Sequence, residues 1–284
     1  MCEYKFQEDS LNNLNDLNSN ISRPIGIFDS GVGGLTVVKE VIKVMPNENV
    51  IYFGDTARVP YGSKSKETIY KFSCQIIRFL KKQNVKAIII ACNTVSSNCY
   101  EELKKEFHDI PIIEVLYSGV KSSISITQNN KIGVIGTEGT IRSNKYETEI
   151  KKLMPQAQVI SKACPLFVPL AEEGFYDMQV TIDIAKIYLS DLDNKVDCLI
   201  LGCTHYPLLA RSIKKAFISN ITIVNPALET ANKMKRYLHN NNLENLNGGE
   251  HKFFVSDYTN KFHSICKKLL KNDYVINKID IENY

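Results

Sequence analysis

The segments AIIIACNT (residues 87–94) and CLILGCTH (residues 198–205) follow the same plan. In each, a short apolar run precedes one small residue, a cysteine, and then residues that carry hydroxyl, amide or imidazole groups. Such a run predicts a buried parallel strand that ends at the cysteine. The two cysteines, Cys92 and Cys203, are 111 residues apart.

A second pair of segments has nearly the same spacing. IGIFDSGVGG begins at Ile25 and IGVIGTEGT begins at Ile132, an offset of 107 residues. The agreement of the two offsets predicts an internal duplication, in which each half contains one cysteine-ended strand. The alternative interpretation is coincidence between ordinary strand–helix units.

Outside these segments, short apolar runs alternate with amphipathic helical patterns. Leu35, Val38, Ile42 and Met45, for example, would share one face of a helix. This alternation predicts the α/β fold class, with parallel sheets and right-handed crossovers. We expect two similar lobes with the active site in the cleft between them, because ligands bind outside the carboxyl ends of strands in such sheets. The predicted strands are 25–28, 50–53, 87–91, 111–115, 132–135, 198–201, 221–224 and 252–255.

The same pattern divides the chain into a tail and two lobes. Residues 1–22 are polar, rich in Asn and without sustained periodicity, which predicts a disordered tail with no packing role. We expect the first lobe to comprise residues 23–117 together with 226–284, and the second lobe residues 118–225. The first lobe regains the end of the chain because the signature segments of the second half stop near residue 225.

Composition excludes several classes of protein. Apolar residues make up 44% of the 284, and no apolar run approaches the roughly 20 residues that cross a bilayer. The net charge is only +4, and few of the basic residues are Arg, which argues against nucleic-acid recognition. The first 20 residues lack the apolar stretch of a secretory signal, so we expect a cytoplasmic protein. Its eight cysteines include no C-x-x-C pair and are predicted to be free thiols.

The two strand-end cysteines are the main candidates for chemistry. Backbone N–H groups at the start of the following helices would lower a thiol pKa and hold a carboxylate. Asn93, Thr94 and Thr204 add side-chain donors at the same points. The structural alternative is that Cys92 and Cys203 are buried packing residues. Their matched neighbours favour function.

Three further positions have both a functional and a structural interpretation. Asp29 follows the first strand, in a glycine-rich turn that matches a dinucleotide fingerprint only loosely. Its carboxylate would interact with a substrate ammonium or a thiol, or it would cap a helix. His205 could exchange a proton with Cys203 or be a packed core histidine. Cys198, Cys203 and His205 do not have a recognised zinc spacing, so no metal site is predicted.

Taken together, four segments resemble the signatures of the glutamate racemases. They are DSGVGGLTV from Asp29, GDTARVPYG from Gly54, ACNT from Ala91 and LGCTHYPLL from Leu201, in the order of the family. Members of that family are cofactor-independent enzymes that make D-glutamate for bacterial peptidoglycan. The resemblance extends from about residue 23 to about residue 225, with a looser match at 253–262.

The resemblance implies a two-base mechanism on L- and D-glutamate. Cys92 and Cys203 would be the two bases, with Asp29 assisting the first thiol and His205 the second. Glu172 matches a family acidic residue near the second thiol. No cofactor is implied, neither pyridoxal phosphate nor a metal, and a homodimer is left open. The substrate-contacting positions implied by the resemblance are Asp29, Ser30, Tyr61, Gly62, Asn93, Thr94, Thr204 and His205.

Three rival functions remain at this stage. An aspartate racemase would use the same two thiols, but a His rather than a Glu follows GCT here, which argues against it. A thiol redox protein would be expected to have neighbouring cysteines. A non-catalytic module of two α/β lobes would need no paired thiols.

Overall fold

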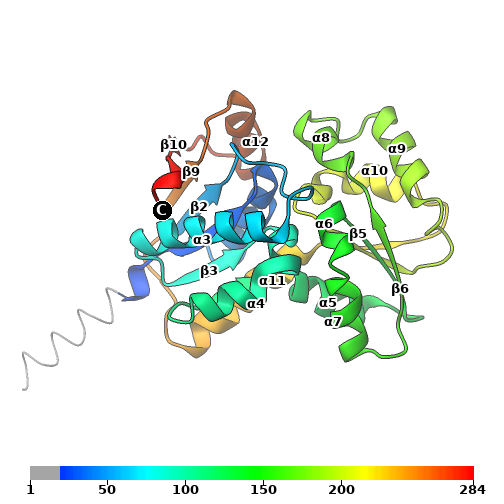
Figure 1. Ribbon diagram of the computed structural model, residues 1–284, viewed down its shortest axis with the longest axis horizontal. Helices are drawn as coiled ribbons and strands as arrows, with labels where there is room; N and C mark the ends of the chain where they lie inside the picture. The colour runs from blue at the N-terminus through cyan, green and yellow to red at the C-terminus, as the bar shows by residue number, and fades with distance from the viewer. Residues whose placement is uncertain (1–19) are drawn as a thin grey trace, which may run out of the picture.

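Two parallel sheets with helices on both faces form two lobes that lie side by side in the computed structural model (Figure 1). The structure describes residues 20–284. The six-stranded sheet has the order β10-β9-β2-β1-β3-β4, and the four-stranded sheet has the order β6-β5-β7-β8. The strands are β1 (Ile25–Asp29), β2 (Val50–Gly54), β3 (Ala87–Ile90), β4 (Ile112–Glu114), β5 (Lys131–Gly136), β6 (Gln158–Ala163), β7 (Cys198–Gly202), β8 (Thr222–Val224), β9 (His251–Val255) and β10 (Ile276–Lys278).

The two sheets repeat one topology. The order β2-β1-β3-β4 in the first lobe matches β6-β5-β7-β8 in the second, and every strand pair is parallel. The predicted α/β class with two similar lobes is therefore confirmed. β3 and β7, which carry the two matched cysteine segments, occupy equivalent places in their sheets.

Helices cover both faces of each sheet, which explains why the central strands are continuously apolar. In β1, Ile25 and Ile27 pack with α2, α11 and α12, whereas Phe28 packs with α3 and α4. All five residues of β1 are buried. The helices are α2 (Leu35–Val44), α3 (Lys66–Lys82), α4 (Asn93–Glu106), α5 (Val115–Ile126), α6 (Glu138–Arg142), α7 (Lys145–Leu153), α8 (Phe167–Glu172), α9 (Gln179–Leu189), α10 (Ala210–Lys215), α11 (Pro226–Asn240) and α12 (Asn260–Leu270), with short 3-10 turns η1 (Val32–Gly34), η2 (Tyr206–Leu209) and η3 (Ile281–Asn283).

The chain crosses between the lobes twice. After β4 it enters α5, whose Leu116 and Val120 pack in the core of the second sheet. After β8 it returns through α11, whose Ala231 and Met234 pack in the core of the first sheet. The boundary expected between residues 117 and 118 falls inside α5, and the one expected between 225 and 226 falls at the start of α11.

Two strands, β6 and β10, were not predicted from the sequence. Both are edge strands, and most of their residues are exposed or half-buried. A strand covered on fewer sides does not need a continuous apolar run, so its sequence lacks the signal that marks the central strands.

Most of the predicted tail, residues 1–19, lies outside the described residues. Ile21 and Ser22, at the end of the predicted tail, contact the first lobe. Asn49 Nδ2 donates to the Ser22 carbonyl at 2.8 Å, and Lys86 Nζ donates to the Ile21 carbonyl at 2.7 Å. These contacts differ from the free tail that the composition suggests. Within residues 20–284, no helix is both long and apolar enough to span a membrane.

Candidate active site

Cys92 and Cys203 face one small cavity between the lobes. Cys92 follows β3 and immediately precedes α4, and Cys203 follows β7 and precedes η2. Both thiols are buried, with 4% and 7% of the residue exposed. The cavity holds about 20 Å³, which is room for about one water molecule. Its lining is Ser30, Val59, Pro60, Tyr61, Gly62, Cys92, Asn93, Thr94, Thr137, Val168, Cys203, Thr204 and His205.

The Cys92 thiol has an environment that favours its neutral form. Its Sγ lies 3.6 Å from the Ser30 hydroxyl. Burial, followed by the charge of Asp29, raises the pKa of Cys92 to about 12. At neutral pH this group therefore holds its proton in the absence of substrate.

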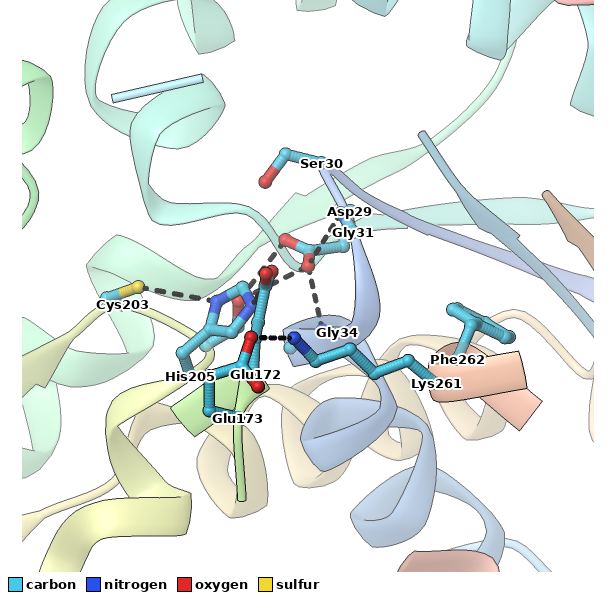
Figure 2. Close-up of polar contacts among 12 residues, drawn as sticks. Asp29, Ser30, Gly31, Gly34, Glu172, Glu173, Cys203, His205, Lys261 and Phe262 are labelled. Atoms are coloured by element: carbon cyan, nitrogen blue, oxygen red, sulfur yellow. Dashed lines mark hydrogen bonds and ion pairs between the residues drawn. The ribbon is translucent and has the colours of Figure 1, made fainter. Parts of the chain in front are cut away.

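The Cys203 thiol ends a chain of polar side chains from the second lobe. Its Sγ lies 3.8 Å from His205 Nδ1, and His205 Nε2 lies 3.1 Å from Glu172 Oε1 (Figure 2). Burial alone would lower the pKa of His205, but the hydrogen bonds with Cys203 and Glu172 raise it to about 10. Burial would raise the pKa of Glu172, and the hydrogen bond with His205 outweighs that effect and lowers it. The pair is thus an imidazolium and a carboxylate at neutral pH.

Asp29 lies behind the cavity and joins the two lobes. The carboxylate is fully buried, and its Oδ2 accepts hydrogen bonds from the amides of Gly34 at 2.8 Å and Gly31 at 3.3 Å. The Thr204 hydroxyl of the other lobe lies 3.3 Å from each carboxylate oxygen. Burial raises the pKa of Asp29, and the charge of His205 and the two amides partly offset that rise. The Asp29 carboxylate therefore binds the amides of Gly31 and Gly34 without being the N-cap residue of η1 or α2, and it lies close enough to Cys92 to raise that thiol's pKa.

The remaining predicted residues lie around the cavity with defined partners. Asn93 Oδ1 accepts a hydrogen bond of 2.7 Å from the Tyr146 hydroxyl. The Thr94 hydroxyl lies 3.0 Å from that of Thr137. The hydroxyl of Tyr61 is engaged by a buried carboxylate, Asp55. Of the predicted residues, Asp29 and Glu172 do not line the cavity, and they reach it through other side chains.

Thr137 lines the cavity, and Tyr146 supports it through its hydrogen bond with Asn93. Neither residue was predicted from the sequence. A signal for Thr137 was present: the alignment that pairs Ile25 with Ile132 also pairs Ser30 with Thr137. Both are hydroxyl residues that follow the first strand of their lobe and line the cavity. Tyr146 has no comparable signal, because its contact with Asn93 depends on how the lobes pack.

Comparison with known proteins identifies the family to which this arrangement belongs. The family model described as Asp/Glu/hydantoin racemase matches residues 33–234. The chain belongs to this racemase family. Among its relatives, glutamate racemase 2 of Caldanaerobacter subterraneus is 46% identical over 267 residues, which cover 93% of this chain and 99% of that protein.

Solved structures of the family have the same fold. The crystal structure of the Francisella tularensis glutamate racemase in complex with D-glutamate has a TM-score of 0.87 and 41% identity, covering 93% of this chain and all of that one. A Bacillus anthracis glutamate racemase has a TM-score of 0.87 and 38% identity, covering 91% and 97%. The aspartate racemase of Picrophilus torridus, at a TM-score of 0.54 and 16% identity over 79% of this chain, shares the fold alone.

Proposed function

We propose that the protein is a cofactor-independent glutamate racemase that interconverts L- and D-glutamate with Cys92 and Cys203 as its two acid/base groups. The observation that carries the proposal is that both thiols, from equivalent strands of two similar lobes, face one cavity. Inverting an α-carbon requires proton removal on one face and delivery on the other. Relatives at 46% and 45% identity over most of this chain are glutamate racemases.

One thiol must begin as a thiolate and the other as a thiol. Cys92, with a pKa of about 12, is the proton donor of the free enzyme. Cys203 lies beside His205 at the end of the chain from Glu172, and we assign it the role of base. Glu172 keeps His205 charged and oriented. When Cys203 removes the α-proton and Cys92 delivers its own proton to the opposite face, Cys203 becomes the thiol and Cys92 the thiolate, so the opposite enantiomer reacts with the roles exchanged.

Polar groups at the strand ends stabilise the carbanion. Ser30, Asn93 and Thr204 place hydroxyl and amide groups around the cavity, where they orient the α-carboxylate as negative charge develops. The amides at the start of α4 add partial positive charge. The cavity of about 20 Å³ is far smaller than glutamate, so substrate enters when the lobes move apart and reacts when they close.

The proposal also covers the cellular location of the enzyme and the use of its product. The described cysteines are free and buried, as in proteins of a reducing compartment, which supports a cytoplasmic location. In that compartment its product is D-glutamate for peptidoglycan synthesis.

Replacing either thiol tests the assignment directly. We expect Cys92→Ala and Cys203→Ala each to reduce glutamate racemisation by at least about 10²-fold, since each removes a positioned proton-transfer group. Cys99→Ala and Cys266→Ala are matched controls, because these thiols are also buried but lie in α4 and α12 outside the cavity. Turnover of both enantiomers, with aspartate as a second substrate, is measured alongside circular dichroism. Near-normal turnover in a folded Cys92 or Cys203 variant contradicts the proposal.

The isotope content of the product tests the two-base mechanism. In heavy water, L-glutamate should yield D-glutamate that already carries deuterium at the α-carbon, because the returned proton comes from the other thiol, which exchanges with solvent. The recovered L-glutamate should stay protiated at early times. Mass spectrometry of the separated enantiomers makes the measurement. Substantial protium in early D-glutamate would mean that a single base shuttles the proton.

A further inference from the structure

Arg58 lies in the loop of residues 55–62, between β2 and α3. Its side chain is the centre of a hydrogen-bond network that supports this loop. Its Nε donates to both carboxylate oxygens of Asp55, at 3.0 and 2.7 Å. The same carboxylate accepts the hydroxyl of Tyr61. The Arg58 guanidinium lies 3.9 Å from the centre of the Phe72 ring, against which the Tyr61 ring also packs. Arg58 thus fixes Tyr61 both through Asp55 and through Phe72.

The other side of the Arg58 guanidinium binds the C-terminal end of the chain. Its Nη1 donates to Gln75 Oε1 at 2.6 Å and to Glu282 Oε1 at 2.9 Å. Gln75 Nε2 donates to the second oxygen of Glu282 at 3.1 Å. Both carboxylate oxygens of Glu282 are therefore used by this network.

The turn that carries Glu282 is a packed element. Ile281 is 3% exposed and lies in the core cluster of α3 and α4. The Tyr284 ring packs edge-on against Phe79 of α3, with 5.3 Å between the ring centres. Figure 1 shows the C-terminus beside α3. Glu282 is thereby held at a fixed place although its own side chain is 59% exposed.

We propose that Glu282 is a positioning residue for the substrate loop, acting through Arg58 and Asp55 on Tyr61. This inference rests on the proposed function and on the substrate contacts of Tyr61 and Gly62 that the resemblance to glutamate racemases implies. Both residues line the cavity, and the Gly62 carbonyl accepts the Gly139 amide of the other lobe at 2.9 Å. A planar guanidinium held between two carboxylates keeps one geometry, and removing the outer carboxylate leaves Arg58 held by Asp55, Gln75 and Phe72 alone, which restricts its orientation less.

The position of this network predicts which kinetic constant changes. The loop forms one wall of the cavity, whereas Cys92 and Cys203 are held by β3, α4 and β7. Loosening the loop should weaken substrate binding and leave the geometry of the two thiols unchanged. We therefore expect KM to rise for both enantiomers while kcat holds.

The test uses the full chain with substitutions at both ends of the network. We expect Glu282→Ala to raise KM about five-fold and to leave kcat within about two-fold. A five-fold rise in KM is the upper range for loss of an exposed ion pair. Glu282→Gln, which keeps an acceptor for Arg58, should give a smaller rise. Glu106→Ala is the matched control, because Glu106, at the end of α4, forms an exposed pair at 3.8 Å with Arg78 of α3, the helix that also carries Gln75. This control should leave both constants unchanged.

A double-mutant cycle separates positioning from general stability. In an Arg58→Lys background the fork is lost, so adding Glu282→Ala should produce no further rise in KM. Additive effects of the two substitutions, or equal losses in Glu282→Ala and Glu106→Ala, would overturn the inference.

Hydrogen exchange gives a second readout that is independent of catalysis. Amides of residues 56–62 should exchange faster in Glu282→Ala than in the unsubstituted protein, while amides of α4 keep their rates. This comparison remains decisive if the thiol assignment fails. Unchanged loop exchange together with an unchanged KM would show that Glu282 anchors only its own turn.

Discussion

The two thiols occupy equivalent places but have different neighbours. Alignment of the two cysteine segments pairs Thr94 with His205, and alignment of the two first strands pairs Asp29 with Gly136. The imidazole thus occurs only beside Cys203, and the carboxylate of Asp29 has no counterpart in the second repeat. The duplicated scaffold places the two sulfur atoms, and residues without a counterpart in the other repeat give each of them a different surrounding.

The raised pKa of His205 leads to a prediction about stability and pH. Folding raises this pKa from 6.5 to about 10. The stabilisation from the imidazolium is therefore complete below pH 6.5 and is lost as the pH rises towards about 10. We expect the free energy of unfolding to fall more steeply across this window in the unsubstituted protein than in His205→Gln.

Urea unfolding at several pH values within the window makes the measurement. His239→Gln serves as control, because His239 is an exposed histidine with a carboxylate partner, Glu244. Parallel pH profiles for the unsubstituted protein and His205→Gln would show that His205 is not held charged by folding.

At the scale of elements, the turn η1 fits tightly against the segment that carries Cys203. A Cβ atom at Gly33 would meet His205 Nδ1 at 2.6 Å, closer than Cβ atoms approach other atoms in proteins. The Thr36 hydroxyl, at the start of α2, donates to the Thr204 carbonyl at 3.1 Å. The glycine-rich turn therefore allows a close contact between the two lobes at this point.

Substituting Gly33 should disturb that contact. We expect Gly33→Ala to reduce kcat/KM by at least about ten-fold, because the new methyl group displaces His205 from Cys203 and from Glu172. Gly31→Ala is a matched control in the same turn, where the nearest atom, Val59 Cγ2, lies at an ordinary 3.4 Å. The measurement is kcat/KM of both variants by steady-state kinetics. Equal values would contradict a steric role for Gly33.

Features of the fold and the site could be predicted from the sequence where their signal was local. The central strands were predictable because coverage on both faces imposes a continuous apolar run, as in β1 and β3. The edge strand β6 carries no such run. The cavity positions of Cys92 and Cys203 followed from their places at strand ends, whereas the contacts of Tyr146 and Glu282 join segments distant in sequence and leave no local pattern.

At the scale of the whole molecule, contacts between the lobes surround the site. Gly139 of the second lobe donates to Gly62 of the first, and Lys261 of α12 forms an ion pair of 2.7 Å with Glu173 at the end of α8 (Figure 2). Glu173 directly follows Glu172, the partner of His205. Movement of one lobe relative to the other therefore changes the site itself.

The double crossing of the chain has a consequence for biosynthesis. All strands of the second sheet lie between residues 131 and 224, but β2 of the first sheet pairs with β9, which begins at His251. As the chain leaves the ribosome, the second sheet can close before the first, whose β2 keeps an unpaired edge until β9 emerges. Proteolysis of a released fragment that ends near residue 245 should leave the second lobe protected and cleave the first. The segment that contains β9 would then complete the lobe that was begun first.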